Sequence, residues 1–124
     1  EFIPNNDHDI RILVVDNKAF AIKRIVRKGD FKASGSGLID YAMESIDPRC
    51  VAIAFEISKR LNCQSIGFDF VFDKDNTPLI VEMGFGFNVH VYDACPGYWT
   101  EDLQWTSAEF NPQEWMLKAL ISKN

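Results

Sequence analysis

The sequence predicts an α+β fold, a mostly antiparallel sheet with helices packed on one face. Two segments rich in β-branched and aromatic residues, each divided by a short polar turn, predict β-hairpins over 9–26 and 65–83. Two other segments carry proline directly after a capping residue, which predicts helices that begin at 48 and at 112. The 124 residues suffice for one domain with its own core.

The composition bounds the class of protein and its partners. The net charge is −5 and no cluster of lysine and arginine occurs, so nucleic acid is not expected as a partner. Hydrophobic residues make up 47% of the chain, which is enough for a core. No apolar run is long enough to span a bilayer, so we expect no membrane partner. Three scattered cysteines indicate a reduced, cytoplasmic setting and are expected to be buried free thiols: Cys50, Cys63 and Cys95.

The first predicted helix has both ends marked. Asp47 is the expected N-cap, Pro48 takes the first helical position, and Asn62 closes the helix after Leu61. Helical spacing gives an apolar face and a solvated face, and we expect the apolar face to pack across the sheet. The apolar face comprises Val51, Ala54, Phe55, Ser58 and Leu61, with Ile53 and Ile57 beside it, and the solvated face comprises Glu56, Lys59 and Arg60.

Three segments are less informative. Glycines and serines alternate within residues 28–37 and predict a loop. The segment has no P-loop or dinucleotide-binding pattern, so a plain surface loop is the simpler interpretation. Residues 89–105 are rich in aromatics and give no clear assignment, although Cys95-Pro96-Gly97-Tyr98-Trp99 is typical of a turn. Asn111, followed by Pro112, predicts the start of a last helix.

Each strand of the 65–83 hairpin carries one acidic residue within an apolar run. Asp69 lies in GFDFVF and Glu82 lies in PLIVEMG, 13 positions later. The turn, Asp73 to Asn76, lies about midway between them, so matched register would place both acids on one face of the sheet. Magnesium favours carboxylate oxygens, and such a pair would suit it. The alternative is a half-exposed sheet face whose acids point to water, and the pattern alone leaves both open.

Basic residues interrupt the first hairpin in the same way. Its strands, 9–15 and 19–26, flank a turn at residues 16–18 and carry Arg11 and Arg24 among apolar neighbours. A guanidinium in such a strand needs an anion, which is either a neighbouring carboxylate or a phosphate. The residues themselves leave this choice open.

Together these motifs resemble the second half of an ATP-grasp domain. The order G-F-D followed by P-L-I-V-E resembles the magnesium hairpin of that superfamily. Glu1-Phe2-Ile3 looks like its hinge strand, and Asp9-Ile10-Arg11 resembles the D-I-R motif that follows the hinge. Arg24, five residues before Gly29-Asp30-Phe31, and Lys32-Ala33-Ser34 are similar to its phosphoryl-facing arginine and its nucleotide loop. The tail is similar to a subgroup found in bacterial surface-polysaccharide gene clusters.

The resemblance implies cofactors, partners and roles. It implies ATP and magnesium (or manganese) as cofactors, with Asp69 and Glu82 as metal ligands and Arg24 as the catalytic residue. It implies a small carboxylate substrate, and an upstream half of the same polypeptide as partner. A homodimer of the piece is the other partner we expect. The ATP-binding residues would be Glu1, Phe2, Ile3, Asp9, Arg11, Lys32, Ala33 and Ser34.

The same resemblance implies a function for the whole protein. We expect residues 1–124 to be a single domain, the C-terminal half of an ATP-grasp domain and a fragment of something longer. The parent would be an ATP-dependent ligase that activates a carboxylate as an acyl phosphate, and this piece alone would be inactive. Two departures from the family pattern favour an alternative, a degenerate nucleotide-binding or structural module: Gly84 stands where the family has a metal-binding asparagine, and Ser34 replaces another asparagine.

Overall fold

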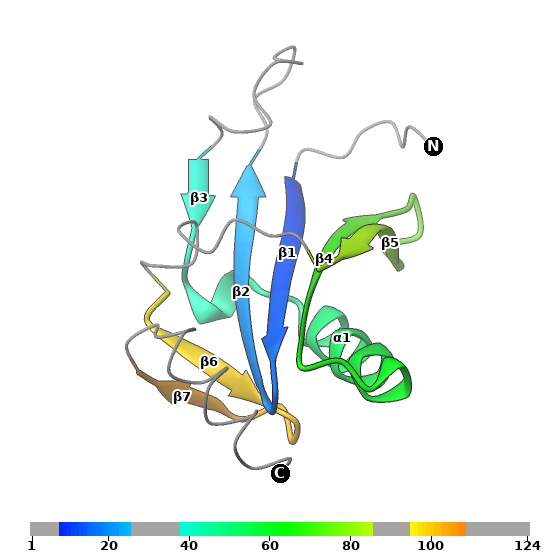
Figure 1. The fold of residues 1–124 in the computed structure, drawn as a ribbon. Coiled ribbons are helices and arrows are strands. Elements are labelled where there is room, and N and C mark those ends of the chain that lie inside the picture. The colour runs from blue at the N-terminus through cyan, green and yellow to red at the C-terminus, as the bar shows by residue number, and fades with distance from the viewer. Residues whose placement is uncertain (1–7, 26–37, 86–94, 109–124) are drawn as a thin grey trace, which may run out of the picture.

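The computed structural model describes residues 8–25, 38–85 and 95–108 (Figure 1). Seven strands form one antiparallel sheet, and a single α-helix of the described residues packs on one of its faces, which confirms the predicted α+β fold. The elements are β1 (His8–Val15), β2 (Lys18–Ile25), β3 (Leu38–Asp40), the 3-10 turn η2 (Met43–Ser45), α1 (Pro48–Leu61), β4 (Ser65–Phe72), β5 (Pro78–Gly84), β6 (Gly97–Thr100) and β7 (Trp105–Ser107).

The sheet is not ordered as the chain is. Its strand order is β5-β4-β1-β2-β6-β7, and β3 also pairs with β2, beside this path. The two predicted hairpins, β1–β2 and β4–β5, therefore lie next to each other through the β1–β4 pairing. This contact brings the charged residues of both hairpins into one region.

The first hairpin, β1–β2, has a two-residue turn. Asp16 adopts a positive φ of 55°, which aspartate tolerates better than most residues do. Pairing is continuous from His8 opposite Ile25 to Val15 opposite Lys18. The prediction is confirmed, except that Lys18 belongs to β2 rather than to the turn.

The second hairpin, β4–β5, has the predicted strands and a turn ordered by Asp73. The Asp73 carboxylate accepts hydrogen bonds from the backbone N–H groups of Asp75 and Thr77, each at 2.9 Å. Asn76 has a φ of 61°, a conformation that asparagine adopts more readily than most residues. Alternate residues of β4 are buried, whereas most of β5 is exposed. This exposure agrees with the strand order, in which β5 lies at one edge of the described sheet.

Helix α1 begins and ends where the sequence predicts. The Asp47 side chain accepts a hydrogen bond from the N–H of Arg49, and Pro48 is the first helical residue. At the other end Asn62 has a φ of 52° and donates its N–H to the carbonyl of Lys59. The buried residues of the helix are Cys50, Val51, Ala54, Phe55 and Ser58.

The prediction of the buried helix face is wrong at one residue, Leu61. Leu61 is 49% exposed, although helical spacing places it on the flank of the buried face. Cys50 lies on the same flank, in the first turn of α1, and it is fully buried. This side of α1 is thus buried in the first turn of the helix and exposed to solvent in the last turn. Helical spacing alone does not predict such a difference along the helix.

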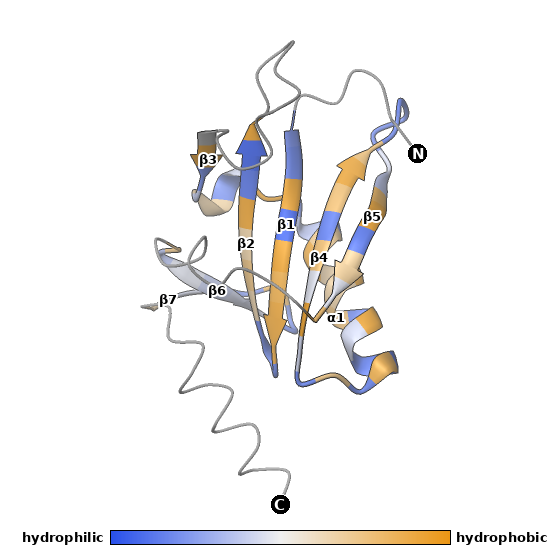
Figure 2. Cartoon of the chain, turned by 45° about the horizontal axis from the view of Figure 1, so that its top comes forward, coloured by the Kyte–Doolittle hydropathy of each residue, from blue (hydrophilic) through white to orange (hydrophobic). Residues whose placement is uncertain are grey.

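Apolar side chains are buried on both faces of β1 and β2. One cluster lies between the sheet and α1, and a smaller one lies on the opposite face. Apart from Lys18 beside the turn, the polar residues of these strands lie toward one end, which Figure 2 shows as hydrophilic bands in the upper parts of both strands. The smaller cluster comprises Leu13, Val15, Phe20, Ile22 and Cys95, with Tyr41 and Tyr98 packed against it.

The turn predicted at residues 95–99 is wrong, because Gly97 begins β6. This strand pairs with β2 and with β7, and neither β3 nor β7 was predicted. A Cβ atom on Gly97 would lie 2.1 Å from the backbone oxygen of Thr106. The glycine is therefore explained by close approach of two strands and not by a turn. Strands of three or four residues leave little periodicity to detect.

The free cysteines largely follow the prediction. Cys50 and Cys95 are buried, whereas Cys63 is half-buried. Burial raises the pKa of the Cys50 thiol to about 12, so this thiol stays protonated near neutral pH.

Several predictions fall on residues outside the described part. These are the hinge at 1–3, the loop at 28–37 with Lys32, Ala33 and Ser34, and the helix expected from 112. Within the described ranges, no helix is long and apolar enough to cross a membrane.

Candidate functional site

Three charged residues form a row across β5, β4 and β1. Asp69 lies directly opposite Glu82 in the β4–β5 pairing and directly opposite Arg11 in the β1–β4 pairing. Residues that face each other in an antiparallel ladder lie on the same side of the sheet. The prediction that the two acids share a face is therefore confirmed.

The row lies on the face of the sheet opposite α1. Phe68 and Phe70 flank Asp69 in the sequence, and both are buried in the cluster that α1 covers. Because alternate strand residues point to opposite faces, the Asp69 side chain points away from the helix. Its side chain is 20% exposed, while Glu82 is exposed.

A register shift within the hairpin makes this arrangement possible. Pairing runs regularly from Phe72 opposite Pro78 to Phe70 opposite Ile80, and then Asp69 faces Glu82. Val81 is the extra residue of a β-bulge. Without the shift, Glu82 would face Phe68 and its side chain would lie on the α1 side of the sheet.

Arg11 and Asp69 form an ion pair. The Nε atom of Arg11 lies 3.1 Å from Oδ1 of Asp69. This Nε atom is buried and has no partner with hydrogen-bond geometry among the described residues, so its contact with Asp69 is electrostatic rather than directional. The arrangement favours the carboxylate interpretation of the Arg11 partner over the phosphate interpretation.

A second ion pair joins Asp9 and Arg24 across β1 and β2. The two residues face each other in the ladder. Nε of Arg24 donates to Oδ1 of Asp9 at 3.2 Å, and Nη2 donates to Oδ2. Burial opposes the charge on Arg24, but the hydrogen bonds and charge of Asp9 outweigh it and raise the pKa of the guanidinium. Arg24 is thus a fixed, fully charged group.

Among the described residues, the charges around Asp69 leave a deficit of positive charge. Three carboxylates, of Asp9, Asp69 and Glu82, share the region with the guanidiniums of Arg11 and Arg24. Burial, together with the charges of Asp9 and Glu82, raises the pKa of Asp69, and the two arginines do not offset this. An added cation would therefore stabilise the ionised form of Asp69.

Comparisons with known proteins show the family of the chain. Residues 1–92 match the sequence model of the RimK-like ATP-grasp domain. The chain belongs to the RimK-like ATP-grasp family.

A solved structure shows the same fold as this ATP-grasp chain. It is that of the ATP-grasp ligase PsnB in complex with a minimal precursor, with a TM-score of 0.61 at 14% sequence identity. The match covers 100% of this chain and 36% of that chain, so the chain spans about a third of the length of PsnB. No curated protein sequence matches the chain.

The residues present fit a divalent cation that keeps other ligands. Asp69 and Glu82 offer carboxylate oxygens, the donors that magnesium favours alongside water and phosphate oxygens. No group of three or more metal-binding side chains occurs within residues 8–25, 38–85 and 95–108. Gly84 lies on the same face, two residues after Glu82, and a Cβ atom there would meet nothing within 4 Å.

The structure unites five of the predicted site residues. Arg24 and Asp9 form one pair, Arg11 contacts Asp69, and Glu82 completes the row. Their roles toward ATP and metal stay predictions. The pairing of Asp9 with Arg24 was not predicted, although the sequence holds the signal: both lie equally far from the turn centre between Asp16 and Asn17.

Proposed function

We propose that the whole protein is an ATP-dependent ligase. A carboxylate of the substrate would attack the γ-phosphorus of ATP, which releases ADP and forms an acyl phosphate. An amine or similar nucleophile would then attack the acyl carbon, and inorganic phosphate would leave. The observation that carries the proposal is the placement of Asp69 opposite Glu82, beside the guanidiniums of Arg11 and Arg24, in a RimK-like ATP-grasp chain.

In this proposal Asp69 and Glu82 hold magnesium or manganese. When bound, the cation would supply positive charge that offsets the charge of the nucleotide phosphates. Arg11 lies 3.1 Å from Asp69 and would offset part of the negative charge of that carboxylate. A carboxyl group must be ionised to bind the metal. Because the charges around Asp69 leave a deficit of positive charge, a bound cation would favour its ionised form, which is consistent with this role.

Arg24 is proposed to stabilise the transferred phosphoryl group. Asp9 holds its guanidinium through two oxygens, so the cation is oriented before a nucleotide binds. A charge that is positioned in advance needs little reorganisation during phosphoryl transfer. Glu1, Phe2 and Ile3, together with the loop 32–34, are proposed to contact the nucleotide.

The test is ADP release by the full-length protein with magnesium, ATP and a panel of small carboxylates and amines. Glu82→Ala is expected to abolish release, because it removes one of the two carboxylates. Glu56→Ala is the matched control, since Glu56 is an exposed acid of α1 that pairs with Arg60. Turnover that survives Glu82→Ala would show that the metal role is wrong.

A second candidate is a nucleotide-binding or structural module without ligase activity. Gly84 favours it, because no side chain stands where a third ligand is expected. A full-length protein that binds ATP with magnesium but releases no ADP with any substrate would support this candidate. A full-length protein that ATP does not stabilise would exclude the ligase and the nucleotide-binding module, and would leave the structural module.

A further inference from the structure

The placement of Glu82 opposite Asp69 depends on the position of β5 along β4. In the described structure, few contacts fix that position. The pairing partner of β5 among the described strands is β4 alone. Val81, Glu82 and Met83 are all exposed, so burial does little to fix the part of β5 beyond Ile80, which packs against the main core cluster. The register shift at Val81 must also be maintained for Glu82 to reach the face of Asp69. The pair therefore needs a restraint from elsewhere in the hairpin.

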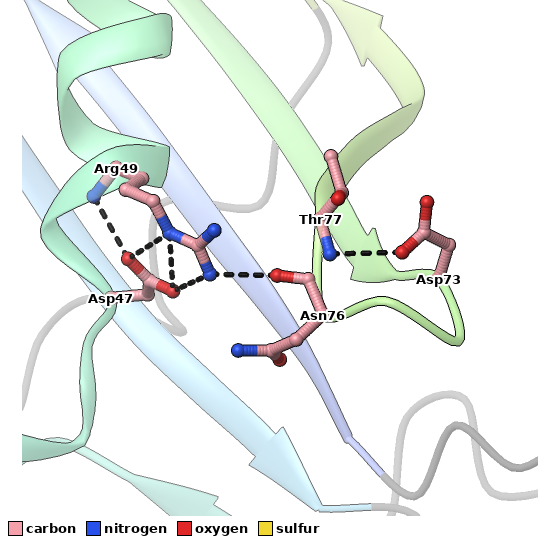
Figure 3. A network of polar contacts seen from close by, with 5 residues as sticks. All are labelled: Asp47, Arg49, Asp73, Asn76 and Thr77. Carbon is pink, nitrogen blue, oxygen red and sulfur yellow. Dashed lines mark hydrogen bonds and ion pairs between the residues drawn. The ribbon is translucent and has the colours of Figure 1, made fainter.

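Such a restraint acts at the turn of the hairpin. Figure 3 shows Arg49 reaching from the start of α1 to the β4–β5 turn, where its Nη2 donates to the backbone oxygen of Asn76 at 2.8 Å. The next residue, Thr77, donates its N–H to the Asp73 carboxylate. The carbonyl that accepts from Arg49 thus belongs to a turn that is already ordered by hydrogen bonds to the Asp73 carboxylate.

Arg49 is itself fixed by Asp47. The Arg49 Nε lies 3.1 Å from each Asp47 carboxylate oxygen, and Nη2 lies 2.7 Å from Oδ2. The same carboxylate caps α1 by accepting the backbone N–H of Arg49. Because α1 packs on the sheet through its buried face, Arg49 links the hairpin turn to the packed body of the domain.

We propose that Arg49 is a positioning residue for the Asp69–Glu82 pair, acting through the β4–β5 turn. This inference rests on the proposed function, which assigns a cation to that pair. The described contacts of Arg49 are with Asp47 and Asn76, so it acts on the carboxylates through the backbone. By holding the Asn76 carbonyl, it sets how β5 lies along β4 and how Glu82 meets Asp69.

The test uses the chain as it stands and manganese as the probe, with free Mn²⁺ measured by electron paramagnetic resonance. Arg49→Ala is expected to weaken Mn²⁺ binding about three- to fivefold, the effect of losing a half-exposed charged contact. Arg49→Lys keeps a cationic donor and is expected to restore part of the affinity.

Lys59→Ala is the matched control. Lys59 is another exposed cation of α1, and its Nζ lies 2.8 Å from Oε2 of Glu101, next to β6 rather than β5. Its loss is expected to lower the melting temperature about as much as Arg49→Ala does, and to leave Mn²⁺ affinity unchanged. Equal weakening in both variants would overturn the inference, because a general loss of stability would then explain it.

Glu82→Gln separates the two proposals. If it leaves Mn²⁺ affinity unchanged, or if the wild type shows no Mn²⁺ binding, the proposed metal role is wrong. If Glu82→Gln weakens binding and Arg49→Ala does not, the role of Arg49 is wrong.

Amide hydrogen exchange supplies a readout that needs no cation. Arg49→Ala is expected to accelerate exchange in β5 relative to β1, whereas Lys59→Ala is not. Unchanged β5 exchange in Arg49→Ala would overturn the inference. Should Arg49→Ala fail to fold, Arg49→Lys carries both measurements, with a smaller change of the same sign.

Discussion

The two hairpins of this domain differ in what holds them. β1 and β2 pair without interruption, bury apolar side chains on both faces, and join Asp9 to Arg24 across the ladder. β5 in the other hairpin is mostly exposed, shifts register at Val81, and presents Glu82 beside Asp69. The first hairpin is built for stability, and the second places carboxylates together at a cost in stability. Substitutions that compare the two test this division.

The largest expected effect lies in the first hairpin. Phe20 is fully buried on the face opposite α1, and the centroid of its ring lies 5.9 Å from that of Tyr98. Phe20→Ala is expected to lower the free energy of unfolding by about 3–5 kcal/mol, measured by urea denaturation, because it leaves a cavity. Phe85→Ala, at the 69% exposed Phe85 after β5, is the control and should change it by less than about 0.5 kcal/mol. Similar losses would contradict the division.

Two glycines give the next comparison. Gly97→Ala places a methyl group 2.1 Å from a backbone oxygen of β7, which must move. We expect a loss of about 1–3 kcal/mol in unfolding free energy. Gly84→Ala in β5 meets open space and is expected to be tolerated to within about 0.5 kcal/mol. Thermal unfolding of both variants measures the difference, and a tolerated Gly97→Ala would mean that the β6–β7 contact is looser than described.

Gly84 also offers a gain of function. Gly84→Asn adds an amide oxygen on the face of Asp69 and Glu82, in open space. We expect Mn²⁺ to bind about tenfold more tightly, or about 1.4 kcal/mol, because the site gains a ligand. Gly84→Ala is the control that adds a side chain without a donor. Equal affinities in the two variants would contradict a metal site at this position.

The smallest effect concerns the charge of Asp69. A carboxyl whose pKa is raised by folding binds its proton more tightly in the folded state, so its charge costs stability at neutral pH. Asp69→Asn is therefore expected to keep or raise the unfolding free energy at pH 7, by less than about 1 kcal/mol. The difference in unfolding free energy between the variant and the wild type should narrow as the pH falls through the raised pKa of Asp69. Urea denaturation between pH 7 and pH 4 measures it.

Asp47→Asn is the control of opposite sign. The hydrogen bond from Arg49 lowers the pKa of Asp47, so its charge stabilises the fold above the unfolded pKa. That contribution is lost as the pH falls through the lowered pKa. The variant should be less stable than the wild type at pH 7. An Asp69→Asn variant that loses stability at pH 7 would show instead that the Arg11 ion pair outweighs the cost of burial.

Local signals explain why much of the fold is predictable. The turn at Asp16, the cap at Asp47 and the left-handed Asn62 each act within a few residues, and each lies where the sequence indicates. Gly97 shows the limit of such signals. Its neighbour Pro96 makes it resemble a turn residue, but a strand ten residues away requires it.

The site divides in the same way. Arg24 and Asp9 are related by hairpin symmetry, so the turn alone fixes their pairing. Arg11 and Asp69 belong to strands separated by β2, β3 and α1, and only the assembled sheet brings them together. The contact of Arg49 with Asn76 joins residues 27 positions apart, and no spacing in the sequence signals it.

The sequence by itself determined the two hairpins, the ends of α1 and the presence of an acid in each strand of the second hairpin, because turns, caps and alternation act over short distances. The tertiary structure alone decided on which face Glu82 lies. A regular ladder from the turn would have directed it toward α1, and the extra residue at Val81 reverses this. Register in this exposed edge strand depends on contacts with the rest of the domain rather than on its own residues.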